Sequence, residues 1–182
     1  MRTPLTSAML AVLLGACAAT PAPRERTVAE EEVTRQIAER GTATQAVANL
    51  AAASGSLVSG RVLMAQQDDG VRVRGEIGGL VRHGAHGLQV HERGDCSAVD
   101  ASSAGRYYDA MAGARQDGAV GAEPGRIVAD ARGVAAVDLL IRGAVLGGGA
   151  DNDIAGRALL VLGATPGAIS ARVACGIVTT AE

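Results

Sequence analysis

The sequence predicts an all-β domain with the architecture of a Greek-key sandwich or flattened barrel. From Ser56 onward apolar side chains recur with a period of two, most plainly in residues 71–77, where aliphatic residues alternate with charged ones. This alternation is typical of a half-buried antiparallel strand. No long helical pattern interrupts the region, and short turn segments separate the apolar runs at regular spacing, which favours a sandwich or a barrel.

The individual strands follow from these apolar runs and the turns between them. Gly-, Asp- and Arg-containing segments supply the turn chemistry at residues 68–70, 78–79, 131–133 and 147–149. The chain has no Phe or Trp, so its core must be built from Val, Leu, Ile and Ala. The predicted strands are 57–65, 71–77, 88–91, 127–129, 135–141, 158–162 and 173–178.

The N-terminus resembles a bacterial lipoprotein signal peptide covering residues 1–16. Arg2 precedes an apolar run that is too short to span a bilayer, and the run ends in Leu-Gly-Ala before Cys17. We expect lipid on Cys17 to anchor the protein to the cell envelope on its periplasmic side. Ala18 after the cysteine favours the outer membrane over the inner one. The alternative is an ordinary secretory signal.

Residues 17–54 are predicted to be a tether that is flexible or partly helical. Pro21 and Pro23 open the segment, and good helix formers follow with few bulky core residues. Val28, Val33 and Ile37 recur at imperfect helical spacing, which predicts one or two marginal helices. A helix that binds a partner is the alternative. The globular domain is then expected over residues 55–179.

Charge argues against nucleic acid as a partner. The chain has 17 basic and 19 acidic residues, and every basic residue is an arginine that stands apart from the others. Such scattered arginines offer no continuous stripe to a phosphate backbone. Neither a protein partner nor an oligomeric state can be read from the sequence.

Three motifs stand in order along the predicted domain. They are HGLQVHERGDC at residues 86–96, GRALLVL at 156–162 and RVACGIV at 172–178. Together they resemble the Cu,Zn superoxide dismutase family over residues 55–179. This resemblance implies a β-sandwich, with copper and zinc as the metals that the family uses for its reaction.

The resemblance also implies that most metal ligands are replaced. The first two copper histidines correspond to Gln89 and His91, the metal-bridging histidine to Tyr107, and the last copper histidine to Leu162. A zinc carboxylate corresponds to Glu123, while Val120 stands where a zinc histidine belongs. We therefore expect neither copper nor zinc as a cofactor.

The histidines are interpreted as structural. The chain contains three histidines in all, and among the copper positions only His91 retains the family's residue. His86 matches a family histidine that hydrogen-bonds the backbone, and His83 is assigned to a loop. A new metal site made of His83, His86, His91, Tyr107 and Glu123 is the alternative, although their spacing does not require it.

Arg172 and two cysteines complete the resemblance. Arg172 takes the position that guides the superoxide anion in the family, and we favour a structural role in which it hydrogen-bonds carbonyls near the cysteine loop. With Cys17 assigned to lipid, Cys96 and Cys175 remain as an even pair in an exported protein. Both match the family's paired cysteines, which implies a disulfide; two buried free thiols are the alternative.

The predicted function is that of a superoxide dismutase-like envelope lipoprotein without dismutase activity, which acts as an interaction or scaffold module. One alternative is a divergent copper-dependent enzyme built around His91 and Tyr107. Another is a weak periplasmic copper binder that uses His83, His86 and His91. The departures from the family fall on the electron-transfer ligands, so the fold and the activity are separate questions.

Overall fold

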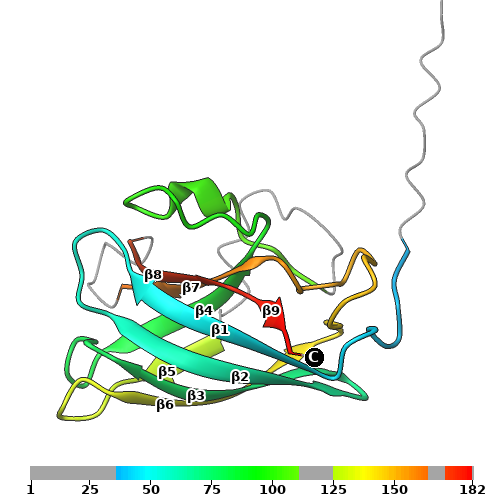
Figure 1. The fold of residues 1–182 in the computed structure, drawn as a ribbon. Coiled ribbons are helices and arrows are strands. Elements are labelled where there is room, and N and C mark those ends of the chain that lie inside the picture. The colour runs from blue at the N-terminus through cyan, green and yellow to red at the C-terminus, as the bar shows by residue number, and fades with distance from the viewer. Residues whose placement is uncertain (1–35, 111–124, 164–170, 182) are drawn as a thin grey trace, which may run out of the picture. The chain divides into compact units, whose positions relative to one another are not determined.

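The computed structural model describes residues 36–110, 125–163 and 171–181. Within these ranges the chain forms nine β-strands and one short 3-10 helix, and no α-helix occurs in them (Figure 1). None of these residues belongs to a helix that is long and apolar enough to cross a membrane. The elements are β1 (Gln45–Ala52), β2 (Ser59–Gln67), β3 (Gly70–Gly78), β4 (Ala85–His91), η1 (Ser102–Ala104), β5 (Gly125–Val128), β6 (Ala135–Arg142), β7 (Ala158–Leu162), β8 (Arg172–Ile177) and β9 (Thr179–Thr180).

The strands form one antiparallel sheet in the order β5-β4-β7-β8-β1-β2-β3-β6, with β9 paired to β1. The neighbours β4 and β7, and likewise β3 and β6, are not consecutive in the chain, so the connections cross over as in a Greek key. β1 belongs to both halves of the sheet, because most of it pairs with β2 while Ala51 and Ala52 pair with β8. β5 and β6 are the two ends of a nearly closed barrel. The predicted fold class is confirmed.

The period-two pattern fixes which side chains enter the core. In β3 the residues Val71, Val73 and Ile77 are fully buried, whereas Arg72 and Arg74 point outward and both contact Asp138 of β6. Burial of an aliphatic side chain contributes roughly 1.5–3 kcal/mol to stability. Aliphatic side chains from β1 to β8 supply most of this core.

The seven predicted strands all overlap observed ones, β2 to β8, but β1 and the two-residue β9 were missed. Gln45–Ala52, assigned above to the tether, is β1, so the domain boundary at residue 55 is wrong. Its inward residues are Ala46, Ala48 and Leu50. Alanine is the best helix former, and its small side chain gives a weak hydrophobic signal, which hid the alternation. The rest of the predicted helical segment, residues 17–35, lies outside the described residues.

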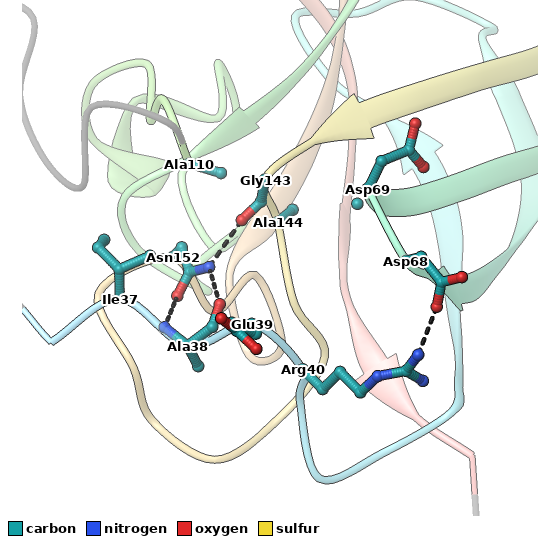
Figure 2. A pocket seen from close by; sticks show the side chains of 11 residues that line it. Ile37, Ala38, Glu39, Arg40, Asp68, Asp69, Ala110, Gly143, Ala144 and Asn152 are labelled. Carbon is teal, nitrogen blue, oxygen red and sulfur yellow. Dashed lines mark hydrogen bonds and ion pairs between the residues drawn. The ribbon is translucent and has the colours of Figure 1, made fainter.

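The described residues before β1, 36–44, form a strap without helical structure, although Ile37 belonged to the predicted helical pattern. Asn152, which is almost fully buried, holds the strap at Ala38: its amide nitrogen donates to the carbonyl oxygens of Ala38 (2.8 Å) and Gly143 (2.7 Å), and its oxygen accepts from the Ala38 N–H (Figure 2). Gly41 lies so close to the next loop that a Cβ atom on it would stand 2.0 Å from the Leu146 carbonyl oxygen. The strap is therefore part of the domain.

The loop that receives the strap is a turn organised by Asp153. Its carboxylate accepts backbone N–H groups of Gly147 (2.8 Å), Gly149 (2.9 Å) and Ala155 (2.8 Å). The Asp153 carboxylate is therefore hydrogen-bonded to three N–H donors of its own loop and holds that loop in shape.

Candidate functional site

The candidate site lies on the outer face of β4 and β7. Gln89 and His91 are two residues apart on β4 and therefore share this face. The antiparallel register sets Gln89 opposite Leu160 and His91 opposite Ala158. Leu162 lies opposite Gly87, diagonal to Gln89 on the same face. Three of the predicted ligand positions thus share one surface, as the family motif requires.

This surface is closed by hydrocarbon. Leu160 and Ala158 have no exposed area, and Leu162 is buried as well. Ala158 and Leu160 belong to a small apolar cluster with residues from the η1 region, β8 and the end of the β1 segment. Its members are Ala53, Ala101, Ala104, Ala158, Leu160 and Cys175, with Cys96 packed against them. At Leu162 a hydrocarbon side chain stands where the family's motif predicts an imidazole ring.

Tyr107 comes to the edge of the same surface. It forms an isolated bridge with His91, and the neighbouring Tyr108 N–H donates to the Val90 carbonyl oxygen at 2.9 Å. Tyr107 and Tyr108 thus pair with the end of β4, whereas β5 pairs with its beginning. Burial and the nearby Asp109 carboxylate raise the pKa of the Tyr107 hydroxyl, which keeps it protonated at neutral pH.

His91 is held by the backbone and is neutral at pH 7. Its side chain is buried, and Nδ1 lies 3.0 Å from the Gly105 carbonyl oxygen, so Nδ1 carries the proton and donates it. Burial lowers the pKa of His91; the Arg172 charge lowers it further, while the Gly105 hydrogen bond opposes the shift. Nε2 is then an unprotonated nitrogen, buried and without a hydrogen-bond partner among the described residues.

Arg172 fixes the loop that contains this carbonyl. Its guanidinium donates to the carbonyl oxygens of Ala101 and Gly105, each at 2.6 Å. Gly105 O therefore accepts from both His91 and Arg172. These bonds tie the first residue of β8 to the loop after β4, which is the structural role favoured above. Charge-assisted hydrogen bonds of this kind are stronger than neutral ones.

The disulfide joins the same two parts of the chain. Cys96 and Cys175 are bonded, and 79 positions separate them in sequence. This confirms the predicted pair. The disulfide and Arg172 together hold the η1 loop against β8.

The three histidines do not gather into one site. His86 and His91 are five residues apart on β4 and point to opposite faces. His86 Nδ1 lies 2.9 Å from the Leu162 carbonyl oxygen, the backbone contact expected of it, and its Nε2 has no partner in the described part of the chain. His83 is exposed in the turn before β4, with a left-handed backbone. No group of three His, Cys, Asp or Glu side chains that could hold a metal ion exists among the described residues.

Some predicted positions fall outside the described residues. These are the lipidation site Cys17 and the zinc positions Val120 and Glu123.

Other important residues were missed by the sequence analysis. Tyr108 is buried, its hydroxyl donates to the Asp151 carbonyl oxygen, and the Arg157 guanidinium lies 3.7 Å from the centre of its ring. Arg157 also donates to the Glu92 carbonyl oxygen at 2.8 Å. The sequence offered one indication of this role. The chain has two tyrosines and no other aromatic residue of the Phe or Trp type, and a large aromatic side chain in an aliphatic core is expected to make many packing contacts.

Comparison with known families agrees with this geometry. A model of the copper/zinc superoxide dismutase (SODC) family matches residues 58–178, from β2 through the end of β8. The chain belongs to the copper/zinc superoxide dismutase family. No curated protein matches it.

The donor set of this family member does not fit a copper site. Copper of this type takes several imidazole nitrogens, and all three histidines of the chain lie in the described ranges, where His91 alone faces the site. Its free Nε2 has almost no accessible surface. The remaining copper positions offer an amide, a phenol and hydrocarbon, so His91 is the one copper position on this face that keeps the family's imidazole.

Proposed function

We propose that the protein is a non-catalytic member of the copper/zinc superoxide dismutase family, attached to the bacterial envelope by lipid on Cys17, and that its rigid β domain serves as an interaction or scaffold module. The observation that carries this proposal is the outer face of β4 and β7, where Gln89, Leu160 and Leu162 accompany a single histidine. The disulfide and the Arg172 bonds support the rigidity that a scaffold needs.

The energetics support the loss of catalysis. Dismutation needs a centre that alternately gains and loses one electron, and ordinary side chains do not do this. A complete structural zinc site contributes about 10–16 kcal/mol over four ligands, so one histidine supplies roughly 3–4 kcal/mol, which corresponds to about millimolar affinity. Millimolar affinity does not retain copper in the face of competing ligands.

Copper titration tests this proposal directly. Calorimetry measures the binding of Cu(II) to the purified full-length chain, and we expect a dissociation constant of about 1 mM or weaker. We also expect the copper-loaded sample to turn over superoxide no faster than the same concentration of free copper. Stoichiometric copper binding at micromolar or lower concentration, with turnover above free copper, contradicts the proposal.

One observation favours a residual copper site as the second candidate function. His91 presents an unprotonated Nε2 beside the family's copper positions. If this nitrogen binds copper, His91→Ala abolishes copper uptake while His83→Ala, at the exposed turn, leaves it unchanged. Equal weak uptake by both variants rejects the second candidate.

Membrane attachment has its own test. In cells grown with a radiolabelled fatty acid, we expect label on the wild-type chain and its recovery with outer membranes. Cys17→Ser removes the thiol to which the lipid is attached, so the variant should carry no label and leave the membrane fraction. Because the chain's net charge is −2, electrostatic attraction to anionic lipid does not replace the anchor. An unlabelled wild-type chain, or a labelled variant, contradicts the anchor.

A further inference from the structure

The outer face of β1, β2 and β3 has an apolar centre. Leu63 of β2 is 57% exposed, although β2 is paired on both sides, with β1 and β3 (Figure 1). The antiparallel register sets Val47 of β1 opposite Leu63, and Ala65 follows two positions later on β2, so these side chains share the outer face. The paired strands fix the backbone on which Leu63 is carried. An exposed leucine is thus presented to solvent at a fixed position.

Three arginines border this apolar centre. Arg61 is two positions before Leu63 on β2 and therefore points to the same face. On β3, Arg74 lies directly opposite Leu63, and Arg72 lies opposite Ala65. A guanidinium group binds a carboxylate through two parallel hydrogen bonds, and arginine is enriched at protein interfaces. The surface around Leu63 therefore has the groups that recognise a carboxylate.

The carboxylates of this face do not neutralise its arginines. Arg72 and Arg74 share one partner, Asp138 of β6, with the Arg74 nitrogen 3.3 Å from the Asp138 oxygen. Arg61 forms no ion pair with a described residue, although Glu76 lies opposite it in the register. Three positive and two negative side chains leave one positive charge here, on a chain whose total charge is −2. The face is therefore locally electropositive.

Two hollows adjoin Leu63. The larger one has a volume of about 440 Å³ and extends from β1 across β2 to β3, with Val47 and Ala65 among its lining residues. The smaller one has a volume of about 330 Å³ and lies between β2 and β3. Arg61, Leu63 and Arg74 line both. Each hollow thus combines hydrocarbon with two guanidinium groups, which suits a partner that carries both aliphatic and acidic side chains.

We propose that this face docks an acidic segment of a partner protein, whose carboxylates pair with Arg61 and Arg74 while an aliphatic side chain of the segment packs against Leu63. The inference rests on the proposed function, because it gives the interaction module its surface and the chemistry of its partner. Hydrocarbon contact contributes to affinity, and the charges select and orient the partner.

The pattern of charges favours a protein segment over an anionic membrane. Basic clusters that bind anionic lipid hold roughly 4–8 lysine or arginine residues. Here Glu76 and Asp138 stand among three arginines, and the next arginine on the face, Arg142, has Asp69 at 3.6 Å. A plane of phosphate groups would meet these carboxylates as like charges. A peptide can place its carboxylates next to the arginines alone.

Selection from a library of random dodecapeptides tests the proposal on the full-length chain. Immobilised wild-type protein should enrich peptides that combine two or more Asp or Glu residues with Leu, Ile or Val. Arg61→Gln/Arg74→Gln should not enrich them. The matched control Arg82→Gln/Arg126→Gln removes two exposed arginines outside this face and should enrich them as the wild type does. Enrichment of basic or uncharged peptides, or equal enrichment by the Arg61→Gln/Arg74→Gln variant, overturns the proposal.

Fluorescence anisotropy of the most enriched peptide, synthesised with a label, measures its affinity. We expect the dissociation constant to rise about tenfold in Arg61→Gln/Arg74→Gln and about tenfold in Leu63→Ser. Leu57→Ser changes a leucine that is 86% exposed before β2 and should leave the affinity unchanged. Binding should also weaken as salt concentration rises, because salt screens the charges. These substitutions are at exposed positions, so the variants are expected to fold. An unchanged affinity in either variant of the face overturns the proposal.

Vesicles of phosphatidylglycerol test the membrane as the other occupant, with Cys17→Ser protein used so that no lipid anchor contributes. Binding to these vesicles that depends on Arg61 and Arg74, without selection of acidic peptides, overturns the proposal in favour of a membrane. Copper titration of the same samples separates this inference from the proposed function. Tight copper binding refutes the proposed function, whereas weak copper binding without acidic peptides refutes the docking face alone.

Discussion

Removal of the disulfide between Cys96 and Cys175 is expected to lower the free energy of unfolding by about 4.5 kcal/mol, the chain-entropy value for a loop closed across 79 positions. The total stability of a domain is typically 5–15 kcal/mol, so this loss is a large part of it. The physical reason is that the unfolded chain gains freedom when the link is removed. Urea denaturation of Cys96→Ala/Cys175→Ala measures the change.

An exposed residue of the same loop supplies the matched control. Val99→Ala changes a side chain that is 84% exposed and should alter stability by less than about 0.5 kcal/mol. Wild-type protein treated with a reductant should behave like the double variant. A loss below about 1 kcal/mol in both samples means that hydrogen bonds such as the one from Ser54 N–H to the Val99 carbonyl oxygen (2.7 Å) hold the loop without the disulfide.

The sequence predicted the strands whose inward residues are large and failed where those residues are small. Val71, Val73 and Ile77 give β3 a clear alternation, because three of its four inward positions, all except Gly75, are large and apolar. In β1 the inward positions include Ala46 and Ala48, which suit a helix equally well. These residues form a strand because they pair with β2 and β8, and this pairing cannot be predicted from the local sequence.

The candidate site was predictable in register but not in its surroundings. Gln89 and His91 are two positions apart on a strand, so their side chains share a face of the sheet. The apolar cluster around Leu160 depends on contacts between segments far apart in sequence. Gly125 and Leu139 meet because the sheet closes on itself, which no short motif encodes.

The structure separates the framework of the family from its metal chemistry. His91 is hydrogen-bonded to the Gly105 carbonyl oxygen, and Arg172 donates to two backbone carbonyls, although the other copper positions carry groups that differ from the family's. Hydrogen bonds to backbone carbonyls stabilise the fold with or without an ion. Stability alone is therefore a sufficient physical reason for both residues to be present, and neither indicates catalysis.

Replacement of Arg172 by Met is expected to cost about 3 kcal/mol of stability, because two charge-assisted hydrogen bonds to the carbonyl oxygens of Ala101 and Gly105 are lost while the aliphatic stem remains. The second effect is on His91. The positive charge of Arg172 lowers the pKa of His91, so its removal should raise that pKa. Denaturation measures the first effect, and NMR titration of the imidazole measures the second.

Two further variants distinguish charge from hydrogen bonding. Arg172→Lys keeps the positive charge, so the pKa of His91 should stay low, but it loses the planar fork and hence part of the stability. Arg126→Met, at an exposed position on β5, should change neither quantity. A His91 pKa that is the same in the wild type, the Met variant and the Lys variant would show that the Arg172 charge does not contribute to it. An unchanged unfolding free energy in Arg172→Met would refute the role of this arginine in holding the η1 loop against β8.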